Sequence, residues 1–282
     1  MDYKYIVIST LDLEKSKYLE NLVNQSSKSL STEFNPKELI FKYKDNHLGY
    51  SIHSLLILDD NVIAAFTCMP RKIDNNSILV GCDTFVDKEH RKNIFILKNL
   101  FKSLQKSELC KNYSLILGVP NEKASLYWNK IAKWEIKSEL DIVFLPVIHG
   151  FFKYFFALIY FLIIILFFSK RKNKLGQNLN DLKKFRNYTS INNVYVRNYV
   201  EHNKNVSYVF GFSQNTRLEL AHNIFKTIIK NGNSVVLVGY NTPLKILRVN
   251  KFIKRKFNVH IKYFDEITLE DIVFDIAILD NR

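Results

Sequence analysis

The sequence predicts an α/β protein of two halves, each with a mixed sheet, joined by an apolar helix that associates with a membrane. Three observations support this: strands and helices alternate before residue 148, they alternate again after residue 175, and an uninterrupted apolar run lies between. At 282 residues and 47% hydrophobic content, the chain is long enough to bury two modest cores. We therefore expect domains at 1–147 and 176–282, with the apolar helix and its basic flank at 148–175.

The first half reads as a buried first strand followed by hairpin, strand, helix, strand and helix. Its start, MDYKYIVISTLDLEKS, lacks the basic patch, long apolar run and cleavage site of a secretory signal, and is interpreted as a strand. The apolar runs SLLILD and VIAAFTC flank the turn dipeptide Asp60-Asn61, which predicts a β-hairpin. The expected elements after it are a strand at 78–86, a helix with the buried face Leu97, Leu100, Phe101 and Leu104, a strand at 114–119 and a helix at 122–132.

The apolar run FFKYFFALIYFLIIILFF occupies residues 151–168 and is interrupted only by Lys153. About 18 residues is the lower limit for crossing a bilayer as a helix. A single crossing would put the two halves on opposite sides, so a helix lying in the interface and a buried core helix stay open as alternatives. The basic cluster at 170–174 would contact anionic headgroups. We expect membrane contact through 151–168, with the catalytic half facing the cytoplasm.

The second half repeats the alternation in altered form. Strands are expected at 206–212, 234–240, 259–264 and 272–279, and helices at 216–230 and 243–256. A short similarity strengthens the idea of an internal repeat: FKYKDNHLGYS at 41–51 and VRNYVEHNKNVSY at 196–208 each contain a Tyr followed by an Asn/His pair.

The composition limits the partners and the cofactors. The chain has 41 Lys and Arg against 27 Asp and Glu, a net charge of +14 that favours nucleic acid, anionic lipid or a phosphate-bearing ligand. The basic residues cluster mainly beside the apolar run, where lipid explains them better, so we expect no nucleic-acid partner. The three cysteines Cys68, Cys82 and Cys110 have no CxxC spacing, which favours a reduced chain and predicts no metal site.

Three segments of the first half resemble the GCN5-related N-acetyltransferase (GNAT) superfamily, more narrowly its bacterial members that modify surface polysaccharides and amino sugars. They are FKYKDNHLGY at 41–50, DTFVDKEHRKNIFILKNLFKSL at 83–104 and GVPNEKASLYWNKIAKW at 118–134. The second half resembles the family only by its pattern of elements and shows no basic glycine-rich loop. The resemblance implies tandem GNAT-like halves, the second degenerate, with acetyl-CoA as the co-substrate of the first.

In this family a basic, glycine-containing loop holds the pyrophosphate of acetyl-CoA. Here the loop reads Glu89-His90-Arg91-Lys92-Asn93-Ile94-Phe95, without glycine. Either Asn93 or Ile94 takes the glycine position, and Asn93 is favoured because Asn tolerates left-handed backbone geometry. The resemblance implies that Arg91, Lys92 and the N–H groups at the start of the following helix bind the pyrophosphate.

The resemblance also implies direct attack of an amine on the thioester. The backbone N–H groups of Thr84, Phe85 and Val86 would bind the thioester oxygen. Asn121 would contact the pantetheine arm, with Ser125 nearby. The family's proton donor, often a Tyr, falls on Trp128, so Tyr127, one residue earlier, is the candidate. As general base we favour Asp83, with Glu89 and His90 as alternatives.

The predicted function is an N-acyltransferase that uses acetyl-CoA and acts on an amino sugar or a lipid-linked precursor at the cytoplasmic membrane face. The alternative is a catalytically degenerate scaffold or binding protein of a membrane-bound biosynthetic assembly, since the loop lacks its glycines.

Overall fold

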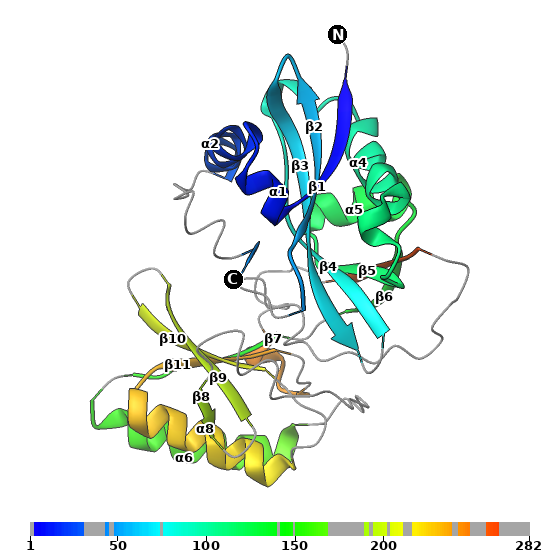
Figure 1. Cartoon of the computed structure of the whole chain (residues 1–282). Coiled ribbons are helices and arrows are strands. Elements are labelled where there is room, and N and C mark those ends of the chain that lie inside the picture. Colours follow the sequence, from blue (N-terminus) through cyan, green and yellow to red (C-terminus); the bar gives the residue numbers. More distant parts are fainter. Residues whose placement is uncertain are drawn as a thin grey trace. The chain divides into compact units, whose positions relative to one another are not determined.

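The computed structural model describes residues 3–30, 43–44, 48–73, 76–139, 142–148, 150–168, 189–191, 194–201, 204–210, 216–238, 242–248 and 258–264. They form two compact units (Figure 1). The first contains the chain up to Lys137 and most of the strand at Asn258–Tyr263, and the second contains the described residues from Ser138 to Arg248. This division differs from the expected boundaries at 147 and 176.

The first unit is a seven-stranded mixed sheet covered by helices on both faces (Figure 1). The strand order is β1 (Lys4–Ser9), β2 (Ile52–Leu58), β3 (Asn61–Ile73), β4 (Asn76–Val86), β5 (Leu115–Gly118), β12 (Asn258–Tyr263) and β6 (Glu135–Glu139). Helices α1 (Thr10–Glu14) and α2 (Tyr18–Leu30) pack on one face, and α4 (Phe95–Lys106) and α5 (Glu122–Lys130) pack on the other. Successive strand residues serve opposite cores: Leu55 packs with Leu13 of α1, whereas Leu56 packs with Leu100 of α4.

The elements predicted for this unit are confirmed with small shifts. The β2–β3 hairpin turns at Asp59-Asp60, one residue earlier than expected, and both residues have positive φ, as a tight two-residue turn requires. The buried face of α4 is Ile96, Leu100, Phe101 and Leu104. Leu97, expected in that face, is only partly buried and lines a cavity described below.

The second unit is a five-stranded sheet with two helices packed against it. Its strand order is β7 (Ile142–Leu145), β11 (Ser234–Val238), β10 (Lys204–Phe210), β9 (Val194–Glu201) and β8 (Thr189–Ile191). Helix α8 (Arg217–Asn231) begins at a capping box between Thr216 and Glu219 and ends at Gly232, whose φ of 65° suits glycine. Helix α6 (Phe152–Phe167) packs beside α8, and both contribute to one core with β7, β10 and β11.

Each sheet receives one strand from the other half of the sequence. Strand β12, from the second half, pairs antiparallel with β5 of the first unit. Strand β7, from the first half, pairs antiparallel with β11 of the second unit. This exchange explains why the units do not follow the expected boundaries.

The apolar run contains helix α6. In the described part of the chain, no helix is long and apolar enough to cross a bilayer. Helix α6 has 16 residues, and its side chains Ala157, Tyr160 and Ile164 are buried in the core of the second unit. Of the three alternatives for this run, a membrane span, a helix in the interface and a buried core helix, the structure shows one face of the helix packed within the protein.

Three further expectations concern the repeat and the second half. The described parts of the two repeat segments differ in structure, since residues 196–201 and 204–208 lie in the antiparallel strands β9 and β10, whereas Tyr43 and Lys44 are helical and Leu48–Ser51 forms no strand. Of the helix expected at 243–256, the structure describes a short 3₁₀ turn at Lys245–Leu247, and the strand expected at 272–279 lies outside the described residues.

Candidate functional site

The first unit opens where two parallel strands separate. Strands β4 and β5 pair only at Leu79 with Ile116 and Val80 with Leu117. Strand β4 then continues to Val86, with no described strand pairing on that edge. A Cβ atom on Gly118 would lie 2.5 Å from the Trp128 ring, so the indole packs directly on the β5 backbone at the point of separation. The separated strands border a cavity of about 620 Å³.

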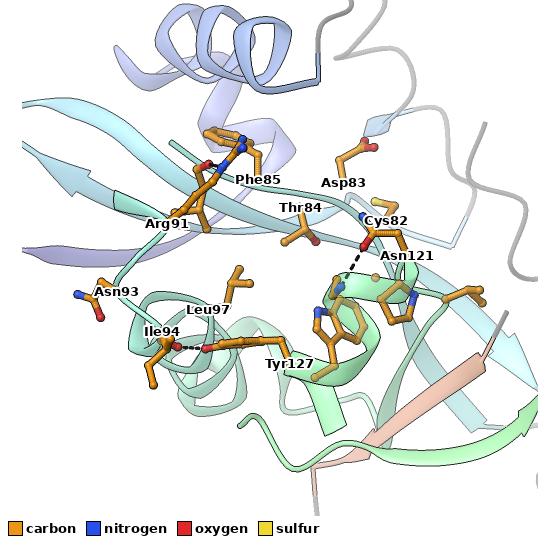
Figure 2. A pocket seen from close by; sticks show the side chains of 16 residues that line it. Cys82, Asp83, Thr84, Phe85, Arg91, Asn93, Ile94, Leu97, Asn121 and Tyr127 are labelled. Atoms are coloured by element: carbon orange, nitrogen blue, oxygen red, sulfur yellow. Dashed lines mark hydrogen bonds between the residues drawn. The ribbon is translucent and has the colours of Figure 1, made fainter. Parts of the chain in front are cut away.

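The cavity lies within the first unit and is lined from three sides (Figure 2). The lining residues come from β4 (Gly81 to Val86), from the loop and start of α4 (Arg91, Asn93, Ile94, Leu97), and from the end of β5 and α5 (Val119, Pro120, Asn121, Ala124, Tyr127, Trp128). The structure thus brings together Asp83, Thr84, Phe85, Val86, Arg91, Asn93, Ile94, Asn121 and Tyr127, as the sequence predicted. Lys92 and Ser125 do not line it, and neither do the alternative bases Glu89 and His90.

A β-bulge in β4 determines where Asp83 points. Phe66 pairs with Thr84 and Cys68 with Gly81, so Cys82 and Asp83 together face Thr67. Figure 2 shows Asp83 and Phe85 on the side of β4 that faces α2, and Thr84 on the side that faces α4 and α5. The cavity therefore has a carboxylate on one side of the sheet and a helix start on the other.

The Asp83 carboxylate accepts a hydrogen bond from the Tyr43 hydroxyl. Tyr43 is 2% exposed, and burial, followed by the nearby Asp83 charge, raises the pKa of its hydroxyl well above the ordinary value. The hydroxyl consequently stays protonated and acts as a donor. Sequence reasoning missed this partner, although a carboxylate within a strand of a buried sheet calls for a donor nearby.

The buried side chain of His53 packs against the Tyr43 ring. The Tyr43 and His53 rings meet edge to face with centroids 5.0 Å apart. The two ring nitrogens of His53 lie 2.9 Å from the hydroxyls of Thr10 and Thr67. Burial lowers the pKa of His53 to about 3, so the ring is uncharged at neutral pH.

The basic loop is built without any left-handed residue. Lys88–His90 form a 3₁₀ turn that Asp87 caps by accepting from the Glu89 N–H at 3.0 Å. Asn93 accepts from the Phe95 N–H at 3.1 Å. Among the described non-glycine residues only Asp59, Asp60 and Lys133 have positive φ. The expectation that Asn93 replaces glycine in a left-handed position is therefore wrong, because right-handed turns and side-chain caps shape this loop.

Arg91 and Tyr127 fix the loop to its surroundings. The Arg91 Nε donates to the Val86 carbonyl at 2.8 Å. The Tyr127 hydroxyl donates to the Ile94 carbonyl and accepts from the Lys98 N–H, the latter at 3.2 Å, and so contacts both backbone groups of the first turn of α4 (Figure 2). Partial burial raises the pKa of Tyr127. In this arrangement, Tyr127 would have to leave the Ile94 carbonyl to protonate a leaving group, so its role as acid stays a prediction.

Two buried polar atoms of lining residues have no hydrogen-bond partner in the part of the chain that the structure describes. They are the Thr84 Oγ1 and the Trp128 Nε1. Unpaired buried polar atoms are rare and costly. A ligand with polar groups along its length, bound in the cavity, could pair with them.

Ser125 has a partner that no sequence signal indicated. Its Oγ lies 2.8 Å from the Nε2 of His260, which is buried on β12. Burial lowers the pKa of this histidine. Because 135 residues separate the two and β12 is exchanged from the second half, neither local spacing nor periodicity could pair them. No group of three His, Cys, Asp or Glu residues that could hold a metal occurs among the described residues.

The sequence matches no protein-family profile and no curated protein, but the structure is similar to solved GNAT structures. A GCN5-related N-acetyltransferase from Kribbella flavida superposes with a TM-score of 0.55 at 8% identity, over 94% of this chain and 72% of that one. A probable N-acyltransferase from Enterococcus faecalis V583 gives 0.55 at 9% identity, over 94% and 73%. A tandem GNAT protein from the clavulanic acid biosynthesis pathway gives 0.53 at 7% identity, over 95% and 100%. These similarities establish a GNAT-like fold.

Proposed function

We propose that the first unit is an N-acyltransferase that binds acetyl-CoA in the cavity between β4 and β5 and transfers the acetyl group to an amine. The observation that carries the proposal is the early separation of these strands, which leaves a cavity with a helix start on one side of the sheet and the Asp83 carboxylate on the other. The GNAT-like fold supports it, since the similar structures described above are named as acetyltransferases or acyltransferases.

The residues present fit acetyl-CoA as a ligand. The positive end of the α4 dipole and the basic side chain of Arg91 suit a pyrophosphate. The Phe95 and Lys98 N–H groups already donate to Asn93 and Tyr127. The unpaired Thr84 Oγ1 and Trp128 Nε1 suit the polar groups of a pantetheine arm. Lys92 lies outside the cavity lining, so its contribution would be long-range charge.

Asp83 is the proposed general base. The amine nitrogen forms a bond to the thioester carbonyl carbon, the carbon–sulfur bond breaks and its electron pair stays on sulfur. The proton lost by the amine passes to the Asp83 carboxylate, directly or through water. Tyr43 holds this carboxylate in one orientation through its hydrogen bond. Tyr127 or water returns a proton to the sulfur.

For the acceptor we propose an amino sugar or a lipid-linked amine, as the resemblance of the three sequence segments implies. A catalytically degenerate binding protein is the second candidate. The observation that favours it is the engagement of both hydrogen-bonding functions of Tyr127 at the start of α4.

Calorimetric titration with acetyl-CoA, paired with an acetyl-transfer assay on a panel of amino sugars, separates these functions. If the protein is an acetyltransferase, acetyl-CoA should release heat on binding and an acceptor should be acetylated. Asp83→Asn should abolish acetylation and leave acetyl-CoA binding unchanged. Binding without turnover on any acceptor supports the degenerate alternative, and absence of binding contradicts both acetyl-CoA proposals.

A further inference from the structure

Helix α6 exposes a continuous apolar face on the second unit. Eight large apolar side chains between Phe151 and Phe167 are between 43% and 85% exposed: Phe151, Phe152, Tyr154, Phe155, Leu158, Leu162, Leu166 and Phe167. The series 151, 155, 158, 162 and 166 follows the three-and-four spacing of one helix face. At 1.5 Å per residue, this face is about 24 Å long.

The opposite face of the same helix is committed to the protein core. Ala157, Tyr160 and Ile164 pack with Leu220, Ile224 and other residues of one cluster. Two polar groups of α6 also turn to the protein, since the Lys153 ammonium donates to the Ile229 carbonyl at 2.8 Å and the Tyr160 hydroxyl to the Pro146 carbonyl at 2.6 Å. The exposed face thus holds no charged side chain, whereas a surface helix in contact with water normally has a polar outer face.

An apolar face of this size indicates a binding partner, because soluble proteins rarely leave such patches in water. The charge of the surrounding sequence distinguishes between partners. From residue 142 to residue 180 there are five Lys and Arg residues, four of them at 170–174, and no Asp or Glu. A second copy of the chain would add the same excess of basic residues, and the stretch 142–180 has no acidic residue to pair with them. An anionic lipid surface offers both the apolar interior and the complementary charge.

We propose that the outward face of α6 inserts into the interface of an anionic bilayer, with the helix lying in the membrane plane. Phe151, Phe155, Leu158, Leu162 and Leu166 enter the boundary between headgroups and acyl chains, and Ala157, Tyr160 and Ile164 stay in the protein core. The second unit is thereby a peripheral membrane-binding module. This proposal does not depend on the transferase function of the first unit.

Vesicle flotation with the full chain tests the proposal. We expect the protein to float with vesicles of equal parts phosphatidylglycerol and phosphatidylcholine, and more weakly with phosphatidylcholine alone. The double variant Phe155→Ser/Leu158→Ser should lower partitioning at least tenfold. It should fold like the wild type, since both side chains are exposed.

The matched control is Ile246→Ser, which removes a 72% exposed apolar side chain from the same unit outside α6. It should bind vesicles like the wild type. Absence of wild-type flotation, or equal flotation of the double variant, overturns the proposal. So does a wild-type dimer, measured by light scattering, that the double variant dissociates while vesicles bind neither protein; that result assigns the face to a second copy of the chain.

Discussion

Both units contain a strand–helix–strand segment with a parallel strand pair, and the two pairs differ in length. In the second unit, β10 and β11 pair over five positions, from Val206 with Ser234 to Phe210 with Val238. In the first unit, β4 and β5 pair over two positions and then separate. Continuous pairing engages the backbone N–H and C=O groups of both strands in hydrogen bonds with each other. Early separation leaves one edge of β4 without a strand partner among the described residues and creates space between β4 and β5. The comparison indicates that the cavity arises from incomplete strand pairing and that a GNAT-like topology alone does not produce it.

The largest expected effect concerns the carboxylate at the opening. Asp83→Asn should lower the rate of acetyl transfer about 10²- to 10⁴-fold, the range for loss of a general base. Affinity for acetyl-CoA should stay near the wild-type value. Initial rates and calorimetric titration measure the two quantities. Tyr43→Phe should give a smaller loss of rate and alter the pH–rate profile, because the carboxylate loses its donor. A wild-type rate in Asp83→Asn removes this residue from the mechanism.

The second prediction concerns pH and the stability of the first unit. The pKa of His53 is about 3 in the folded chain and near 6.5 when unfolded. Between these values the unfolded chain binds a proton that the folded chain does not. The free energy of unfolding should therefore decrease as pH falls from 6.5 towards 3, by on the order of 5 kcal/mol in total. Tyr43 and Asp83 also face this network, and the negative charge of Asp83 opposes the shift.

Tryptophan fluorescence during urea unfolding measures this, because both tryptophans, Trp128 and Trp134, are buried in the first unit. His53→Gln should lower stability at pH 7 and flatten its dependence on pH. An unchanged slope in that variant contradicts the assignment to His53.

The third prediction tests the strand separation directly. In Gly118→Ala the new methyl group would lie 2.5 Å from the Trp128 ring, so β5 or the indole must move. We expect a loss of about 1–3 kcal/mol in stability and weaker acetyl-CoA binding. The double variant Gly118→Ala/Trp128→Phe should recover part of the loss, because phenylalanine lacks the ring atoms that clash. If the losses of stability in Gly118→Ala and Trp128→Phe simply add up in the double variant, the contact between Gly118 and the Trp128 ring does not shape the opening.

The smallest effect is expected from Tyr127→Phe. The Lys98 N–H and the Ile94 carbonyl lose their shared partner, which costs about 1 kcal/mol and should weaken acetyl-CoA binding about fivefold. If Tyr127 only positions the loop, the maximal rate at saturating acetyl-CoA stays near wild type. A fall in that rate larger than the fall in affinity assigns Tyr127 the role of proton donor.

Local patterns in the sequence predicted much of the first unit. Continuous apolar runs around a turn dipeptide predicted the β2–β3 hairpin, whose first strand is buried on both faces, and helical periodicity predicted α4, which is buried on one face. Nine of the eleven predicted site residues line one cavity, because they lie in the last part of β4 or in the segments that follow β4 and β5, which border the space between the separating strands. Their chemical roles stay predictions.

Long-range features left no such trace. The contact between Tyr43 and Asp83 joins residues 40 positions apart, and that between Ser125 and His260 joins residues 135 apart. The bulge at Cys82 and Asp83 depends on the register of β3 against β4, which composition does not encode. The sequence of α6 is apolar on all sides, so it is compatible with a membrane span, an interfacial helix or a core helix, and only packing distinguishes its buried face from its exposed one.

Strand β12 pairs with a strand that is synthesised long before it, so the first sheet is incomplete during much of translation. When the ribosome has completed Gly118, the strand that will cover the free edge of β5 is still 140 residues away, at Asn258. At about 5–20 residues per second this interval lasts about 7–28 s. During that time the nascent first sheet would present an unpaired edge, on which chaperones or neighbouring nascent chains could act. A protein truncated before Asn258 would keep that edge permanently and should aggregate through it.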